Sequence, residues 1–179
     1  MLEGFRRRAG LIYSRVHFRQ SRDPMIHFTN VLTQARRALV ILPEASIDRE
    51  MVTTLLRYLL QKFSSEEITV ILRDDQVYSF ASTPRLKTLT YSNRDLNPWF
   101  VPRRELVEKM NTQSYDVTMD LNMSFSLPSA FLCKASNAPL RVSFAKREGD
   151  WFYNFQVRTK KTDGTVRMYR NFLKCLEMF

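Results

Sequence analysis

Residues 38–63 read ALVILPEASIDREMVTTLLRYLLQKF, and this stretch decides the fold. Its first five residues form a continuous apolar run, which is typical of a strand buried on both faces of a parallel sheet. From Arg49 onward, apolar residues recur every three or four positions, the spacing of a helix with one wide apolar side. The stretch therefore predicts the first half of a βαβ unit. Because ligands bind at the carboxyl ends of such strands, the loop 43–48 is the first candidate site.

The same alternation of short apolar runs and helical periodicity continues along the chain. We expect further strands at 67–72, 86–91, 115–121 and 140–144, and an extended edge segment at 151–157. We expect helices at 23–37, 76–82, from Pro102 onward, at 124–136 and at 166–176, with Asn137 as a left-handed stop. This order predicts an α/β fold: a single Rossmann-like lobe with a mostly parallel sheet of about five to six strands and helices on both faces.

Composition narrows the class of protein. The chain has 179 residues, of which 44% are hydrophobic and only 4 are glycine, as in one compact domain. Two cysteines without a CxxC motif and two histidines support neither a disulfide framework nor a zinc cluster, so we expect no metal and no other cofactor. No apolar run approaches the ~20 residues that cross a bilayer. We expect a cytoplasmic protein, peripheral at the inner face of the cytoplasmic membrane.

The positive charge is concentrated at the N-terminus. Residues 1–37 carry eight arginines against Glu3 and Asp23, a net charge of +6, which leaves +4 of the total +10 for the other 142 residues. We therefore divide the chain into a basic helical arm, residues 1–37, and a lobe, residues 38–179. Within the arm, residues 1–22 have the pattern of an amphipathic helix that rests on an anionic membrane surface or an acidic protein, or else packs on its own domain. The arginines of this segment are Arg6, Arg7, Arg8, Arg15, Arg19 and Arg22.

Four segments of the lobe carry a family resemblance. They read LVILPEASID at 39–48, EITVILR at 67–73, YDVTMDLN at 115–122 and SNAPLRVSF at 136–144. In this order they resemble the first loop and the later strand entries of glycosyltransferase family 9, the lipopolysaccharide heptosyltransferases and their relatives. The resemblance implies a Rossmann-like lobe that corresponds to the acceptor-side half of a two-lobed enzyme.

The resemblance also nominates site residues. Asp48 is its candidate catalytic base, which would take a proton from an acceptor hydroxyl. An aspartate directly before a helix is also a favoured cap, and the two roles can coexist. Asp120 likewise suits a strand-end cap. The residues that the resemblance places at an acceptor or ligand are Glu44, Ser46, Asp120, Asn122 and Arg141.

The chain departs from the family pattern at its loop glycines. Glu44 and Ile47 replace both glycines of the first loop, and Met123 replaces the glycine that follows the fourth strand. Side chains at these positions imply a different loop path. Glu44 also introduces negative charge where the family admits an anionic sugar donor, which indicates a degenerate active site.

Two functions remain open from the sequence. The first is a glycosyltransferase-like protein that acts on a lipid-linked or polysaccharide acceptor, with donor binding supplied by a second chain, because the sequence stops about where the family's interlobe connection would begin. The second is a non-catalytic binding or assembly module on the same fold. Nucleic-acid binding rests on charge alone and ranks below both.

Overall fold

The structure is a computed structural model and describes residues 2–21, 23–25, 27–44, 49–63, 68–75, 86–159 and 164–178. Its helices are α1 (Leu2–His17), α2 (Phe28–Gln34), α3 (Arg49–Lys62), α4 (Arg104–Met110), α5 (Leu127–Ala135) and α6 (Thr165–Glu177), with short 3-10 turns η1 (Asn93–Asp95) and η2 (Gly149–Trp151). Its strands are β1 (Ala38–Ile41), β2 (Ile68–Arg73), β3 (Leu86–Tyr91), β4 (Val117–Asp120), β5 (Leu140–Phe144) and β6 (Phe155–Val157).

The described strands form one six-stranded sheet in the order β3-β2-β1-β4-β5-β6, and every pairing is parallel. This confirms the predicted α/β class and the Rossmann-like lobe. The chain builds one half of the sheet outward from β1 to β3, then returns to the centre and builds the other half outward from β4 to β6. The direction of winding therefore reverses at the place where β1 and β4 lie side by side. In doubly wound sheets the crevice at this reversal, at the carboxyl ends of the strands, is where ligands bind.

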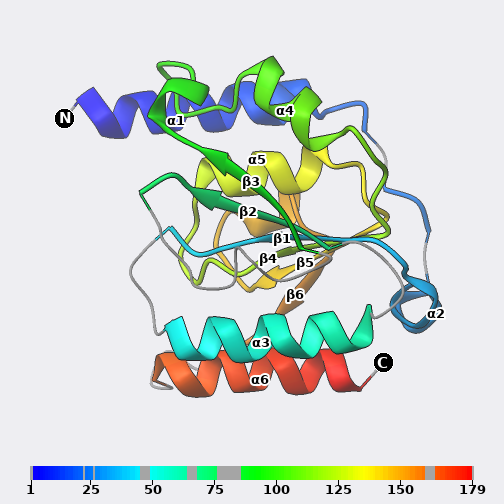
Figure 1. The fold of residues 1–179 in the computed structure, drawn as a ribbon. Coiled ribbons are helices and arrows are strands. Elements are labelled where there is room, and N and C mark those ends of the chain that lie inside the picture. The colour runs from blue at the N-terminus through cyan, green and yellow to red at the C-terminus, as the bar shows by residue number, and fades with distance from the viewer. Residues whose placement is uncertain are drawn as a thin grey trace.

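Helices cover both faces of the sheet (Figure 1). Helices α3 and α6 lie side by side on one face, α4 and α5 lie on the other, and α1 lies outside α5. The side chains of β1 pack on both faces of the sheet. Val40 lies in the core with α3 and α6, whereas Leu39 and Ile41 lie in the core with α4 and α5. All four of its residues are fully buried, as the apolar run predicted.

Helix α1 packs on the lobe through a face with small side chains. Gly10 and Ser14 are buried, and a Cβ atom placed on Gly10 would lie 2.1 Å from the carbonyl oxygen of Trp99. Farther along, the rings of Phe18 and Phe131 meet with centroids 4.8 Å apart. The close approach of α1 at Gly10 therefore depends on the absence of a side chain there.

The predicted helix at 23–37 is wrong in its extent, because among the described residues of that range only Phe28–Gln34 is helical. At its start, Asp23 forms ion pairs with Lys134 of α5 and Arg141 of β5, each at 2.6 Å, and residues 23–25 are not helical. At its end, the carboxylate of Asp116 accepts hydrogen bonds from two successive backbone N–H groups that lead into β1. Long-range ion pairs at one end and long-range hydrogen bonds at the other thus override the local helical pattern.

Two other predictions concern the ends of elements. Asn137 has φ of 54°, which confirms the left-handed stop after α5. Helix α5 begins at Leu127, later than the predicted 124, because the hydroxyl of Ser126 caps it by accepting from the backbone of Ser129. The predicted helix at 76–82 lies outside the described residues.

Candidate functional site

A pocket of about 410 Å³ lies at the carboxyl edge of the sheet. Five neighbouring strands contribute to its wall through the residues that end or follow them, and the N-terminal half of α1 covers it. One such residue from each of β1 to β5 in chain order is Glu44, Arg73, Asn93, Ser126 and Glu148. The pocket therefore occupies the edge at which parallel sheets bind ligands, and its volume falls in the usual range for small-molecule sites.

Asn122 connects the two strands at which the winding reverses. Its Oδ1 accepts a hydrogen bond of 2.8 Å from the backbone N–H of Glu44, which follows β1, while Asn122 itself follows β4. Its Nδ2 donates to Oδ1 of Asp120 at 2.7 Å and to Oγ of Ser129 at 3.0 Å. The predicted candidates Glu44, Asp120 and Asn122 are thus brought together in one hydrogen-bond network.

The carboxylate of Glu44 is held by three hydroxyl groups. Its Oε1 accepts from the Tyr91 hydroxyl at 2.9 Å, from Ser129 at 3.3 Å and, at a shorter distance, from Ser126. Among the described residues none donates to the other oxygen, Oε2. Glu44 lines the pocket, so one side of its carboxylate is fixed by the protein and the other can accept a hydrogen bond from a ligand.

The ionisation of Tyr91 is consistent with its role as a donor. Burial, followed by the negative charge of Glu44, raises the pKa of Tyr91 well above the ordinary value, although Arg73 acts in the opposite direction. A neutral phenol donates its proton, so the hydrogen bond to Glu44 persists through the physiological pH range.

Charged groups of both signs line the pocket. They are Arg7, Arg8, Arg73, Glu3, Glu44 and Glu148. Arg7 pairs with Glu3 at 2.9 Å on the surface of α1, whereas Arg8 forms no ion pair with another described residue. The side chains of Phe100 and Phe125 add aromatic surface. Such a mixture of acceptors, donors and aromatic faces suits a polyhydroxylated ligand better than a purely anionic one.

Asp120 is fully buried beneath the surface. Its Oδ2 forms an ion pair of 2.7 Å with Lys146, whose side chain is only 2% exposed, and also accepts from the hydroxyl of Tyr153. Burial and the charge of Asp120 raise the pKa of Tyr153 well above its ordinary value. Asp120 also accepts a hydrogen bond from the side chain of Asn122, and Asn122 in turn accepts one from the backbone N–H of Glu44. The buried pair is thereby linked to the backbone of Glu44.

Neither Asp120 nor Arg141 is among the residues that line the pocket. Arg141 is buried, with 3% of its surface exposed. Its Nε donates to the carbonyl of Phe152 at 2.8 Å and its Nη1 to the carbonyl of Ala138 at 2.9 Å. The guanidinium also pairs with Asp23. In this structure Arg141 ties three separate segments together at the side of β5.

The arginines of the N-terminal segment have different surroundings. Arg6 donates to the carbonyl of Pro98 and lies 4.8 Å from the ring centre of Phe100. Arg15 pairs with Glu148 at 2.7 Å. Arg8 and Arg19 are exposed, and Arg22 lies outside the described residues. The segment therefore uses part of its charge to attach to its own lobe.

The candidate base Asp48 and the candidate Ser46 lie outside the described residues, so their roles stay predictions. Sequence reasoning missed Tyr91, Ser126 and Ser129, which hold Glu44. A signal was available: Tyr91 ends a strand and Ser126 follows one, at the same edge of the sheet as the first loop. In the described part of the chain no group of three or more His, Cys, Asp or Glu side chains is placed to hold a metal ion.

Solved structures resemble this chain in fold. No family model and no curated protein matches its sequence. A glycosyl transferase family 9 protein from Veillonella parvula DSM 2008 and the E. coli heptosyltransferase WaaC with ADP-2-deoxy-2-fluoro heptose each match with a TM-score of 0.55 and 18% sequence identity over 80% of this chain. The matches cover 42% and 49% of those two chains, so this chain spans less than half of their length. The chain therefore has the fold of one partial lobe of these glycosyltransferases, which confirms at the level of fold the resemblance carried by its sequence motifs.

Proposed function

We propose that this protein is a glycosyltransferase-like, acceptor-side lobe whose carboxyl-edge pocket binds a sugar of a polysaccharide or lipid-linked acceptor. The single observation that carries the proposal is Glu44: it lines the pocket at the point where the winding reverses, with one carboxylate oxygen fixed by three hydroxyl groups. A carboxylate fixed in this way is preorganised to receive a hydroxyl of the acceptor.

The rest of the pocket supports a carbohydrate ligand. Sugar hydroxyls both donate and accept, and the pocket offers carboxylates and guanidinium groups for the two roles. Phe100 and Phe125 provide apolar surface for the faces of a sugar ring. The fold shared with family 9 glycosyltransferases supports the same ligand class.

Binding can be tested by titrating the full chain calorimetrically with a deacylated inner-core oligosaccharide of lipopolysaccharide. Glu44→Gln keeps the shape of the side chain and removes its charge. Because a hydrogen bond to a charged group contributes roughly 1.5–3 kcal/mol, we expect the dissociation constant to rise about 10-fold to 100-fold. Glu105→Gln, on the exposed side of α4, is the matched control and should bind as the parent does.

Either of two results would reject this function. One is the absence of binding by the parent protein to a panel of such oligosaccharides. The other is an unchanged affinity in Glu44→Gln while circular dichroism shows that the variant is folded.

A second candidate is a binding or assembly module without transfer activity. The observation that favours it is the arrangement around Glu44 and Asp120, in which the polar groups at the reversal point are engaged with one another. Under the enzyme proposal, a second chain supplies the donor-binding lobe. Co-purification from the native source, followed by an assay for ADP release from ADP-heptose, distinguishes the two. A partner chain together with ADP release favours the enzyme. Oligosaccharide binding with no partner chain and no ADP release favours the module.

A further inference from the structure

Helix α1 exposes an apolar stripe along its outer side. The four members of this α1 stripe are Leu2 (76% exposed), Phe5 (71%), Ile12 (62%) and Val16 (63%). Residues separated by steps of 3, 7 and 4 lie on one side of a helix. The buried residues Gly10 and Ser14 lie on the opposite side, against the lobe. The stripe therefore points away from the protein and is about 21 Å long, because about 14 helical steps of about 1.5 Å separate its two ends.

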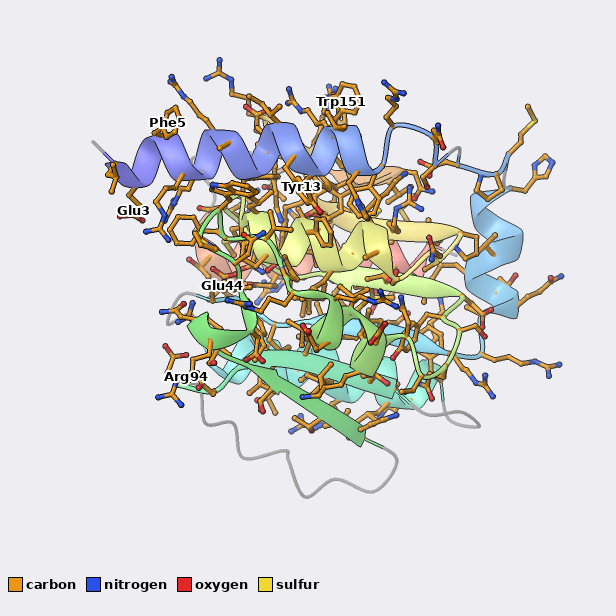
Figure 2. All side chains as sticks on the ribbon, turned by 90° about the horizontal axis from the view of Figure 1, so that it is seen from above. Glu3, Phe5, Tyr13, Glu44, Arg94 and Trp151 are labelled. Carbon is orange, nitrogen blue, oxygen red and sulfur yellow. The ribbon has the colours of Figure 1, made fainter. Side chains whose placement is uncertain are left out.

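A tryptophan extends the α1 stripe. Trp151, in η2, is 54% exposed, and the guanidinium of Arg15 lies 5.1 Å from its ring centre. Figure 2 shows Phe5 and Trp151 projecting on the same outer side of α1. Tryptophan is enriched where an apolar phase meets water, because its ring is apolar and its N–H is polar.

The charge beside the α1 stripe is positive. Arg8 and Arg19 are exposed and form no ion pair with another described residue. The acidic residues nearby are already engaged: Glu3 pairs with Arg7 toward the pocket, and Glu148 pairs with Arg15. An apolar stripe with cations along its flank is complementary to an apolar phase covered by anions.

We propose that the α1 stripe docks on the anionic phospholipid surface of a membrane, with the helix lying in the plane of the interface. No helix in the described ranges is long and apolar enough to cross a bilayer, so the helix would lie on the membrane. A second copy fits less well, because two such faces would bring like charges together. The proposal rests on the α1 stripe, Trp151 and the flanking arginines, and does not depend on the proposed function.

Docking in this orientation has a consequence for the pocket. Arg7 and Leu11 of the same helix line the pocket from its other side, and Arg8 lies between that side and the α1 stripe. With the α1 stripe in the lipid interface, the pocket opens within one helix diameter, about 10 Å, of the headgroups. A lipid-linked acceptor could then reach the pocket without leaving the membrane.

Vesicle flotation tests the proposal on the full chain. The probes are vesicles of phosphatidylcholine alone and vesicles with about 30 mol % phosphatidylglycerol. We expect binding to the anionic vesicles and a partition coefficient at least about 30-fold lower for Phe5→Ser/Ile12→Ser, because two large apolar side chains no longer enter the interface. Met25→Ser/Met178→Ser, which alters methionines that are 103% and 79% exposed elsewhere, is the matched control and should bind as the parent does.

The contribution of charge is tested separately. Arg8→Gln/Arg19→Gln should lower the partition coefficient about tenfold to 30-fold, since a basic residue near an anionic surface contributes about 1 kcal/mol. Arg94→Gln/Lys109→Gln removes the same charge from other exposed positions and should have a much smaller effect. Figure 2 shows Arg94 far from α1.

Fluorescence gives a second readout that does not depend on flotation. The chain has only two tryptophans, Trp99 and Trp151. Trp99→Phe leaves Trp151 as the sole indole, and its emission should shift to the blue and be quenched by brominated lipids in anionic vesicles. Absence of that shift, or vesicle binding that Phe5→Ser/Ile12→Ser does not weaken, overturns the proposal. If light scattering shows that the parent protein is a dimer and that Phe5→Ser/Ile12→Ser is a monomer, a second copy occupies the α1 stripe and the proposal is overturned. Binding to an acidic protein without any binding to vesicles would overturn it in favour of a protein partner.

Discussion

The buried ion pair between Asp120 and Lys146 should be one of the most sensitive points of this fold. Their side chains are 0% and 2% exposed, and their charged atoms are 2.7 Å apart. Lys146→Met keeps most of the side-chain volume and leaves the Asp120 carboxylate buried without its cation. Loss of one partner of a buried pair costs about 3–5 kcal/mol. The carboxylate retains neutral donors from Asn122 and Tyr153, so we expect about 3 kcal/mol, near the lower end of that range.

The assay is urea unfolding followed by circular dichroism, with thermal unfolding as a second measure. For a domain of this size each kcal/mol shifts the melting temperature by about 2–4 °C, so Lys146→Met should lower it by about 6–12 °C. Asp120→Asn/Lys146→Met should lose less than Lys146→Met alone, because the amide leaves no uncompensated buried charge.

A surface pair supplies the control. Arg104 and Glu108 lie 2.6 Å apart but are 87% and 59% exposed. Arg104→Met should leave the stability nearly unchanged, because solvent screens an exposed pair. The reasoning would be refuted if Lys146→Met lost less than about 1 kcal/mol, or if both single variants lost the same amount.

Two further predictions concern packing and pH. Gly10→Ala should destabilise the protein by about 1–3 kcal/mol, because the new Cβ would lie 2.1 Å from the carbonyl oxygen of Trp99. Gly4→Ala is the control: its Cβ would meet no atom within 4 Å, so it should stabilise α1 slightly. Thermal unfolding measures both effects. Burial raises the pKa of Tyr91 above 10.0, so its stabilisation is complete below pH 10 and is lost as pH rises above it. Tyr91→Phe should flatten the alkaline fall in unfolding free energy, and the exposed Tyr13→Phe should not; equal slopes in all three proteins would contradict this.

The fold could be predicted from local pattern to a large extent. The apolar run at Ala38–Ile41 and the helical spacing after Arg49 indicated a parallel strand with its crossover, and both are present. The helix at 23–37 was predicted too long, because the ion pairs of Asp23 with Lys134 and Arg141 join residues more than 100 positions apart. No local periodicity reports such a pairing.

The site could be predicted less fully. The first loop after β1 was identified as the place for a ligand, and the pocket includes Glu44 from that region. The sequence predicts Asn122 and Asp120 as ligand contacts. The structure places both in the hydrogen-bond network that holds Glu44, and Asp120 is buried in an ion pair with Lys146. Whether a carboxylate faces a ligand or an internal lysine depends on neighbours that the sequence spacing does not reveal.

The sequence by itself determined the alternation of strands and helices, because the periods of 2.0 and 3.6 residues are properties of short segments. It also determined that ligand-binding groups gather at one edge, since parallel strands all end there. Only the tertiary structure decided which groups meet: Glu44 lies with Tyr91 and Ser126, which are 47 and 82 residues away. It also decided which side of α1 faces solvent. Strand order and the packing of one helix on another set both outcomes, and these depend on the whole chain.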